Sequence, residues 1–385
     1  MSKTYLASKP RYEILDGLRG VAAMLVVAFH LFESYSKGPD FQIINHGYLA
    51  VDFFFCLSGF VIGYAYDDRW NSMSLGDFFK RRLVRLHPMV IIGSLFGALM
   101  FYFGSQDAFP IIGATPWWQV LLIMLLGFTL LPAPRQWDIR GWDEMHALNG
   151  PAWSLYWEYI ANILYALFIR RFSKTVLAIF VAAFAFLTID LTLNLDVFGL
   201  LANRTATANT VIGGWALNPE QSYVGAARLL YPFFGGLLIS RIGKLLPVAG
   251  GFWWCSLIVA VALAMPFVEG GEKGTFTCAN GIYNAAVILF VFPLVVMMGA
   301  GSKISGKRSI AVCKFLGEIS YPLYLIHYPL IYAHMAWIAH NKDAAIGNHV
   351  FVGVSLFILS IAIAYAVLKL YDEPLRNRLK SLLWK

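Results

Sequence analysis

The chain has 385 residues, of which 59% are hydrophobic and only 14% are charged, and its formal net charge at pH 7 is +8. A soluble domain is typically about 45–50% apolar and about 25% charged, so the composition excludes a soluble globular protein and indicates a polytopic membrane protein. In such a protein the basic loop residues set the topology, so the positive charge does not point to a nucleic acid partner.

Apolar runs of about 20 residues, the length that crosses the hydrocarbon core as a helix, recur along the whole chain. No polar stretch is long enough to form a separate soluble domain. We therefore expect an all-α bundle that forms a single domain over residues 1–385. Ten spans are predicted, near 14–34, 47–66, 83–103, 151–169, 175–193, 222–240, 247–267, 281–300, 314–337 and 349–370.

The basic residues between these spans predict the topology. They fall in six clusters, at Lys3, Lys9 and Arg11, at Lys80–Arg85, at Arg170–Lys174, at Arg241 and Lys244, at Lys303–Arg308, and at Arg376, Arg378, Lys380 and Lys385. The positive-inside rule places all six on the cytoplasmic side. Both termini are therefore expected in the cytoplasm.

One short apolar segment, 117–131, does not fit this alternation. If it crossed the membrane, Arg170 and Arg171 would face the outside. We therefore predict a re-entrant or interfacial helix at 117–131 that enters and leaves on the outer face. Non-spanning backbone at membrane depth is tolerated only where protein or a wet cavity covers it, so segment 104–150 is expected to belong to a site.

The first span carries ionisable residues on one face. Arg19 and His30 are about three helical turns, or about 16 Å, apart, with Asp16 and Glu33 near the same face. Charged groups at membrane depth usually face the bundle interior or a wet cavity. Histidine titrates near neutral pH, which suits the removal of a hydroxyl proton. His30 is thus a candidate base and Arg19 a candidate anion contact; the alternative is a snorkelling Arg19 paired with Asp16 and a structural His30.

Two further polar features lie near predicted span boundaries or inside spans. Arg82 and Arg85 are one turn apart at a cytoplasmic boundary of a predicted span. A pair of guanidinium groups can bind phosphate, but basic residues at this place also determine how the span is oriented in the membrane. Ser58 precedes Gly59 in the second span, and this pair also fits a close contact between helices.

The outer half of the bundle offers its own candidates. Glu158 lies one to two turns inside the span that follows segment 132–150, and a carboxylate there needs a partner. Ser320, Tyr324 and His327 follow helical spacing in a late span and form a second polar stripe, although tyrosines in such a stripe are also common packing residues.

These features occur together and in order. The motifs are Arg19 with His30 after ten intervening residues, Phe54-Phe55-x-x-Ser58-Gly59-Phe60, Arg82-x-x-Arg85, Trp153-Ser154-Leu155-x-x-Glu158, Ser320-Tyr321-x-x-Tyr324-Leu325-x-His327-x-Pro329 and Glu373-Pro374-x-Arg376. In this combination the chain resembles the acyltransferase-3 family of integral membrane acyltransferases over residues 11–376.

The resemblance implies transfer of an acyl group, usually acetyl from cytoplasmic acetyl-CoA, to a hydroxyl group beyond the cytoplasmic (inner) membrane. It implies that Arg19, Arg82 and Arg85 hold the phosphates of CoA, and we place Ser58 with them as a contact to the donor. His30 is the expected base, at about half membrane depth. Direct transfer and a route through an acylated His30 both stay open.

The acceptor is expected to be an extracytoplasmic glycan such as an exopolysaccharide or O-antigen. It would approach past Glu158, His327 and the 104–150 region. Tyr324, Ser58 and Ser320 are the candidate oxyanion donors. A small-molecule or lipid-linked acceptor and a succinyl or longer acyl donor remain alternatives, and the oligomeric state is open.

The main alternative from another class is a non-enzymatic glycan transporter, but the inverted repeats of many transporters are not visible.

No metal site is expected, because the histidines lack the short ligand spacing of a zinc site. Family members with an appended extracytoplasmic domain exist, and none is expected here after Lys385.

Overall fold

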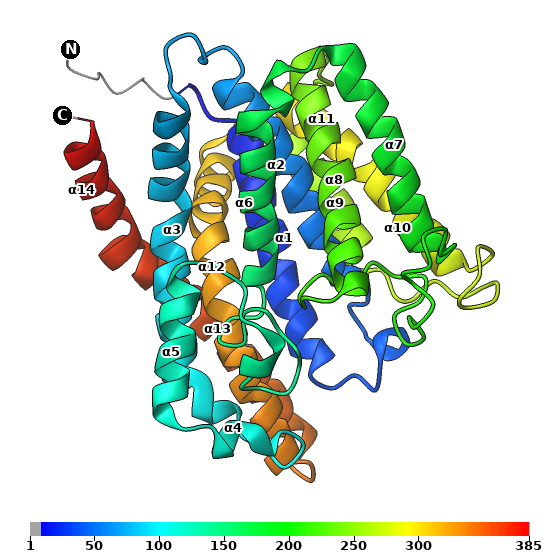
Figure 1. Ribbon diagram of the computed structural model, residues 1–385, viewed down its shortest axis with the longest axis vertical. Coiled ribbons are helices and arrows are strands. Elements are labelled where there is room, and N and C mark those ends of the chain that lie inside the picture. The colour runs from blue at the N-terminus through cyan, green and yellow to red at the C-terminus, as the bar shows by residue number, and fades with distance from the viewer. Residues whose placement is uncertain (1–8, 385) are drawn as a thin grey trace.

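The computed structural model describes residues 9–384, so Lys3 and Lys385 of the two terminal basic clusters lie outside the described residues (Figure 1). Within this range the regular structure is helical, apart from one isolated bridge between Gln106 and Phe109. The predicted all-α polytopic bundle is confirmed.

Eight helical stretches among the described residues are long and apolar enough to cross a membrane. They are α1 (Glu13–Glu33), α2 (Ala50–Tyr66), α3 (Leu75–Met100), α7 (Lys174–Leu193), α8 (Pro219–Ile242), α10 (Ala279–Ala286) with α11 (Phe292–Gly301), α12 (Lys307–His340), and α13 (Ile346–Val367) with α14 (Glu373–Leu383). The shorter helices are α4 (Pro110–Ala114), α5 (Trp117–Phe128), α6 (Ala152–Leu167) and α9 (Gly251–Ala264).

Two of the ten predicted spans are these shorter helices. The span expected at 151–169 is α6, with 16 residues, and the one at 247–267 is α9, with 14. At 1.5 Å per residue α6 is about 24 Å long, which is less than the hydrocarbon core of about 30 Å. Figure 1 shows α6 beginning about halfway along the bundle.

The segment before α6 explains this position. Helix α5 has only 12 residues, about 18 Å, and packs on α3, so it is too short for a full span. The chain then returns into the bundle, where Ile139, Met145 and Leu148 are buried. The prediction that 117–131 is not a full span is therefore confirmed.

Helices α1 and α12, at opposite ends of the sequence, form the most extensive helix pair among the described residues. A side-chain carbon added at Gly20 would lie 2.2 Å from the carbonyl oxygen of Leu316, and one at Gly317 would lie 3.0 Å from Asp16 Cβ. Small residues at such positions let two helix backbones approach closely. The site described below lies along this contact.

Basic residues gather at one end of the bundle, here named the basic end. Arg241 donates to Asp67 at 2.7 Å and to the carbonyl oxygen of Phe172 at 2.8 Å. The Arg170 guanidinium lies 4.1 Å from the centre of the Trp70 ring. The ends of α2, α6 and α8 meet here, and Figure 1 places the two ends of the described chain at the same end.

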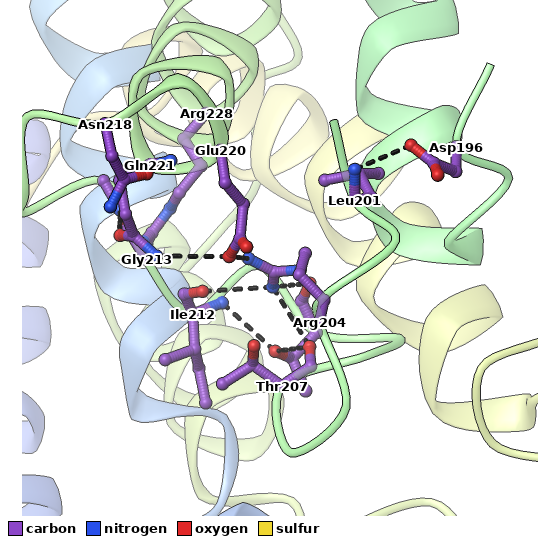
Figure 2. A network of polar contacts seen from close by, with 12 residues as sticks. Asp196, Leu201, Arg204, Thr207, Ile212, Gly213, Asn218, Glu220, Gln221 and Arg228 are labelled. Atoms are coloured by element: carbon purple, nitrogen blue, oxygen red, sulfur yellow. Dashed lines mark hydrogen bonds and ion pairs between the residues drawn. The ribbon is translucent and has the colours of Figure 1, made fainter. Parts of the chain in front are cut away.

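Segment 194–218, between α7 and α8, is held together by a buried arginine (Figure 2). Arg204 Nη2 donates to the carbonyl oxygens of Thr207, Thr210 and Ile212 at 3.0, 3.2 and 3.1 Å. Arg204 Nη1 lies 3.7 Å from Glu220 Oε1 at the start of α8. One side chain thus satisfies several carbonyl groups that a buried loop would otherwise leave unpaired.

A second buried arginine joins α8 to α2. Arg228 Nη2 donates to Asp52 Oδ2 at 2.7 Å and to the Tyr48 carbonyl oxygen at 2.6 Å, while Nη1 donates to the Gly213 carbonyl oxygen at 3.2 Å. The two charged side chains are 2% and 0% exposed. Arg228 Nε also donates to Asp52, at 3.3 Å, so each guanidinium nitrogen has an acceptor within the protein and we assign the pair to the stability of the fold.

Replacing Asp52 by alanine should lower the free energy of unfolding by about 3–5 kcal/mol, because Arg228 would keep a buried charge without its partner. The matched control is Asp40→Ala, which breaks the partly exposed pair with Lys273 and should cost no more than about 1 kcal/mol. Unfolding by SDS titration of the purified protein in mild detergent measures both. Equal losses in the two variants would contradict the assignment.

Candidate active site

One polar cluster joins α2, α3 and α6. Glu158 Oε1 accepts a hydrogen bond from Arg82 Nη2 at 2.7 Å and another from Ser58 Oγ at 3.0 Å. Arg82 is buried, and its Nε atom has no hydrogen-bond partner among the described residues. A buried guanidinium with an unused donor can accept a second anion such as a phosphate.

The other two predicted arginines lie close to this cluster. Arg19 Nε donates to Ser320 Oγ at 3.0 Å, and Arg19 Nη2 donates to Asp16 Oδ1 at 2.8 Å. Arg85, one turn after Arg82 on α3, is exposed, and the charged groups that act on it include Arg19, Arg82 and Asp16. The structure therefore brings the three arginines together on the side of the basic end.

The position of Glu158 differs from the one that the sequence predicts. The sequence places it beside the acceptor together with His327, whereas the structure pairs it with Arg82 and Ser58. The reason is that segment 132–150 reaches into the bundle, so α6 begins deep in it. Two turns along α6 then bring Glu158 to the side of the arginines.

The second polar cluster is a pair of stacked histidines. The rings of His30 on α1 and His327 on α12 have centroids 5.5 Å apart and an interplanar angle of 26°. His30 Nδ1 lies 2.7 Å from Glu33 Oε2, and His327 Nδ1 lies 3.0 Å from the Leu323 carbonyl oxygen. His327 is fully buried, and its Nε2 atom has no hydrogen-bond partner among the described residues. The Tyr328 ring lies 4.7 Å from the His30 ring.

His30 does not lie halfway along its helix, as expected, but close to the end that faces away from the basic end. It is in the last turn of α1, which ends at Glu33. The Ser34 hydroxyl donates to the His30 carbonyl oxygen at 2.9 Å and so satisfies one of the carbonyl groups that a helix end leaves free.

Tyr324 connects the two clusters. Its hydroxyl group lies 2.8 Å from Ser154 Oγ on α6, and its ring centroid is 6.0 Å from that of His327. Ser154 and Glu158 are one turn apart on α6, as Ser320 and Tyr324 are on α12. We name the side chains along the α1–α12 contact the polar row: Arg19, Ser320, Tyr324, His327 and His30.

A buried carboxyl group lies beyond the histidines, in segment 132–150. Glu144 Oε2 accepts a hydrogen bond from Tyr332 at 2.6 Å, and the Arg140 guanidinium lies 3.4 Å from the centre of the Tyr332 ring. Burial raises the pKa of Glu144 to about 7, although nearby Arg140 opposes the shift. His146, whose pKa burial lowers to about 3, lines a small cavity together with Asn149.

Several contacts of this site were not singled out from the sequence. Ser154 belongs to a recognised motif, but its contact with Tyr324 joins two distant segments and has no local signal. Glu33 was noted on the face of His30, and its spacing of three residues was the available signal for their contact. Glu144 lies in an irregular segment without periodicity.

No group of three or more histidine, cysteine, aspartate or glutamate side chains within residues 9–384 is arranged to hold a metal ion. The four cysteines are free and buried. The side chains that the structure brings together at the site are those of histidines, arginines, carboxylates and residues with hydroxyl groups.

The sequence profile described as Acyltransferase domain, which is that of the acyltransferase-3 family, matches residues 12–369. "Protein 2 in picA locus" of Rhizobium radiobacter is 31% identical over 185 residues, 45% of this chain and 91% of that protein. The acyltransferase MdmB of Streptomyces mycarofaciens is 26% identical over 84% of this chain and 80% of that protein.

The peptidoglycan O-acetyltransferase OatA of Listeria monocytogenes is 26% identical over 86% of this chain, and the match spans about half of that relative, 51% of its length. No solved structure gives a significant match to the chain. The profile covers the arginines, both histidines and the whole polar row. The chain therefore belongs to the acyltransferase-3 family and is a multi-pass membrane acyltransferase.

Proposed function

We propose that the protein transfers an acetyl group from cytoplasmic acetyl-CoA to a hydroxyl group of an extracytoplasmic glycan. The observation that carries this proposal is the polar row, which begins at an arginine cluster near the basic end and leads to two stacked histidines. We assign the basic end to the cytoplasm, in accordance with the positive-inside rule, so the donor and the acceptor approach the row from opposite sides.

The donor site is supported by the charges around Arg82. Arg19, Arg82 and Arg85 outnumber the carboxylates Asp16 and Glu158 that pair with them. Such an excess of positive charge suits the phosphates of CoA, because guanidinium groups bind phosphate in a fork geometry. The thioester arm then extends along the polar row toward His30.

The chemical step follows from the histidine pair. His30 Nε2 takes the proton of the acceptor hydroxyl while the hydroxyl oxygen bonds to the thioester carbonyl carbon. The Tyr324 hydroxyl donates to the oxygen that becomes negative. The carbon–sulfur bond then breaks, and the CoA thiolate leaves with the proton that His30 had taken, so the base is regenerated.

The glycan acceptor is supported by a relative and by the site's position. The Listeria relative is a peptidoglycan O-acetyltransferase, and the histidines lie toward the end of the bundle that we assign to the outside. The decisive experiment is mass spectrometry of surface glycans from cells with and without the chain, after supply of isotopically labelled acetate. Label in an ester on the glycan supports transfer, whereas unlabelled glycan that is merely relocated supports a transporter.

Replacing His30 by alanine should lower the transfer rate by about 10²–10⁴-fold, because a positioned base contributes about that factor. The rate is measured with labelled acetyl-CoA and membrane vesicles that retain their surface glycan. His340→Ala, at the exposed end of α12, is the matched control and should keep the wild-type rate. Near-normal transfer by the His30 variant removes it as the base.

Replacing Arg85 by alanine should raise the KM for acetyl-CoA about tenfold, because a hydrogen bond to a charged group is worth about 1.5–3 kcal/mol. The exposed Arg85 is preferred to Arg82, whose loss would leave Glu158 without its ion pair. Arg378→Ala, on the exposed face of α14, is the control. An unchanged KM in the Arg85 variant would contradict its phosphate role.

A further inference from the structure

The two stacked histidines differ in what faces their Nδ1 atoms. His30 Nδ1 lies 2.7 Å from the carboxyl group of Glu33, and His327 Nδ1 lies 3.0 Å from the Leu323 carbonyl oxygen. A carboxylate and a carbonyl oxygen only accept hydrogen bonds, so Nδ1 carries the proton in both neutral rings. Each ring therefore keeps the lone pair of its Nε2 atom for a ligand.

The two acceptors have different consequences for a positive charge. A carboxylate beside Nδ1 stabilises the imidazolium that forms when Nε2 takes a proton, as in the serine protease triad. A carbonyl oxygen also keeps the proton on Nδ1, but it supplies no negative charge to stabilise an imidazolium. Because His327 is fully buried and a charge at membrane depth is costly, His30 alone of the pair is equipped to hold a proton during the reaction.

The neighbours of the pair do not change this difference. Tyr328 presents a ring at 4.7 Å from the His30 ring, and Tyr324 presents one at 6.0 Å from the His327 ring. Glu144 is engaged by the Tyr332 hydroxyl. Among the described residues, Glu33 is the one carboxylate recorded in contact with either ring.

We infer that Glu33 is a positioning residue that makes His30 the base, and that His327 is a neutral acceptor for a second hydroxyl group of a polyol. This inference rests on the proposed function and adds the class of acceptor. The buried Nε2 atom of His327 has no partner in the described protein, and such atoms normally find one. Two Nε2 lone pairs in stacked rings match neighbouring hydroxyl groups of one sugar, of which His30 deprotonates one and His327 orients the other.

The test compares Glu33→Gln, Glu33→Asp and His327→Gln, with Glu272→Gln on the exposed 265–278 segment as the matched control. Transfer is measured with labelled acetyl-CoA and glycan-bearing membrane vesicles. Glu33→Gln should lower kcat about 10–100-fold, as the loss of an orienting partner does elsewhere, with the KM for acetyl-CoA unchanged. Glu33→Asp should restore part of kcat. His327→Gln, which keeps a neutral acceptor, should stay within about tenfold of wild type.

A spectroscopic readout separates positioning from a structural role. Nitrogen-15 spectra of histidine-labelled protein in bilayers should show the Nδ1–H tautomer of His30, assigned by its loss in His30→Ala, and Glu33→Gln should weaken it. Wild-type kcat and an unchanged spectrum in Glu33→Gln overturn the inference. Loss of transfer in His327→Gln as complete as in His30→Ala overturns the neutral role of His327. Near-normal transfer by His30→Ala instead overturns the base assigned under the proposed function.

Discussion

The close pairing of α1 with α12 is the constraint on which the site depends. Gly20 lies against the Leu316 backbone, and this approach brings Arg19 to Ser320 and His30 to His327. Each contact joins residues about 300 positions apart in the chain. A side chain at Gly20 would separate the helices and with them both ends of the polar row, so the small residues of this contact are as necessary to the site as its polar ones.

Helix α6 forms the second wall of the site, and because it is short it begins inside the bundle. Because segment 132–150 reaches into the bundle, α6 begins at the depth of Ser154, which contacts Tyr324, and one turn later carries Glu158 to Arg82. A full-length span would have placed these motif residues farther from the basic end. Because α6 begins inside the bundle, it brings the proposed donor site close to the histidines.

Sequence periodicity and the charge of the loops were enough to predict the helical bundle, eight of its ten expected spans and the short helix near 117–131, because these depend on local hydrophobicity. The spans expected at 151–169 and 247–267 are the shorter helices α6 and α9. Periodicity and loop charge also placed Arg19, His30 and Glu33 on one helix face. They did not predict the partner of Glu158, because the depth of α6 is set by the irregular 132–150 segment, whose burial leaves no periodic signal. The stacking of His30 on His327 depends on how two helices that are distant in sequence pair with each other. The spacing of residues within either helix does not determine that pairing.

The aromatic surroundings of the histidines also have an electrical consequence. A row of polar side chains through a bilayer is a route along which protons could discharge the membrane potential. Phe29, Tyr328 and His327 are all buried around His30: the first two meet its ring edge-on, and His327 stacks on it. If donor and acceptor meet at this row, as proposed, these rings occupy the space beside His30 that a continuous file of water would need to carry protons across the membrane.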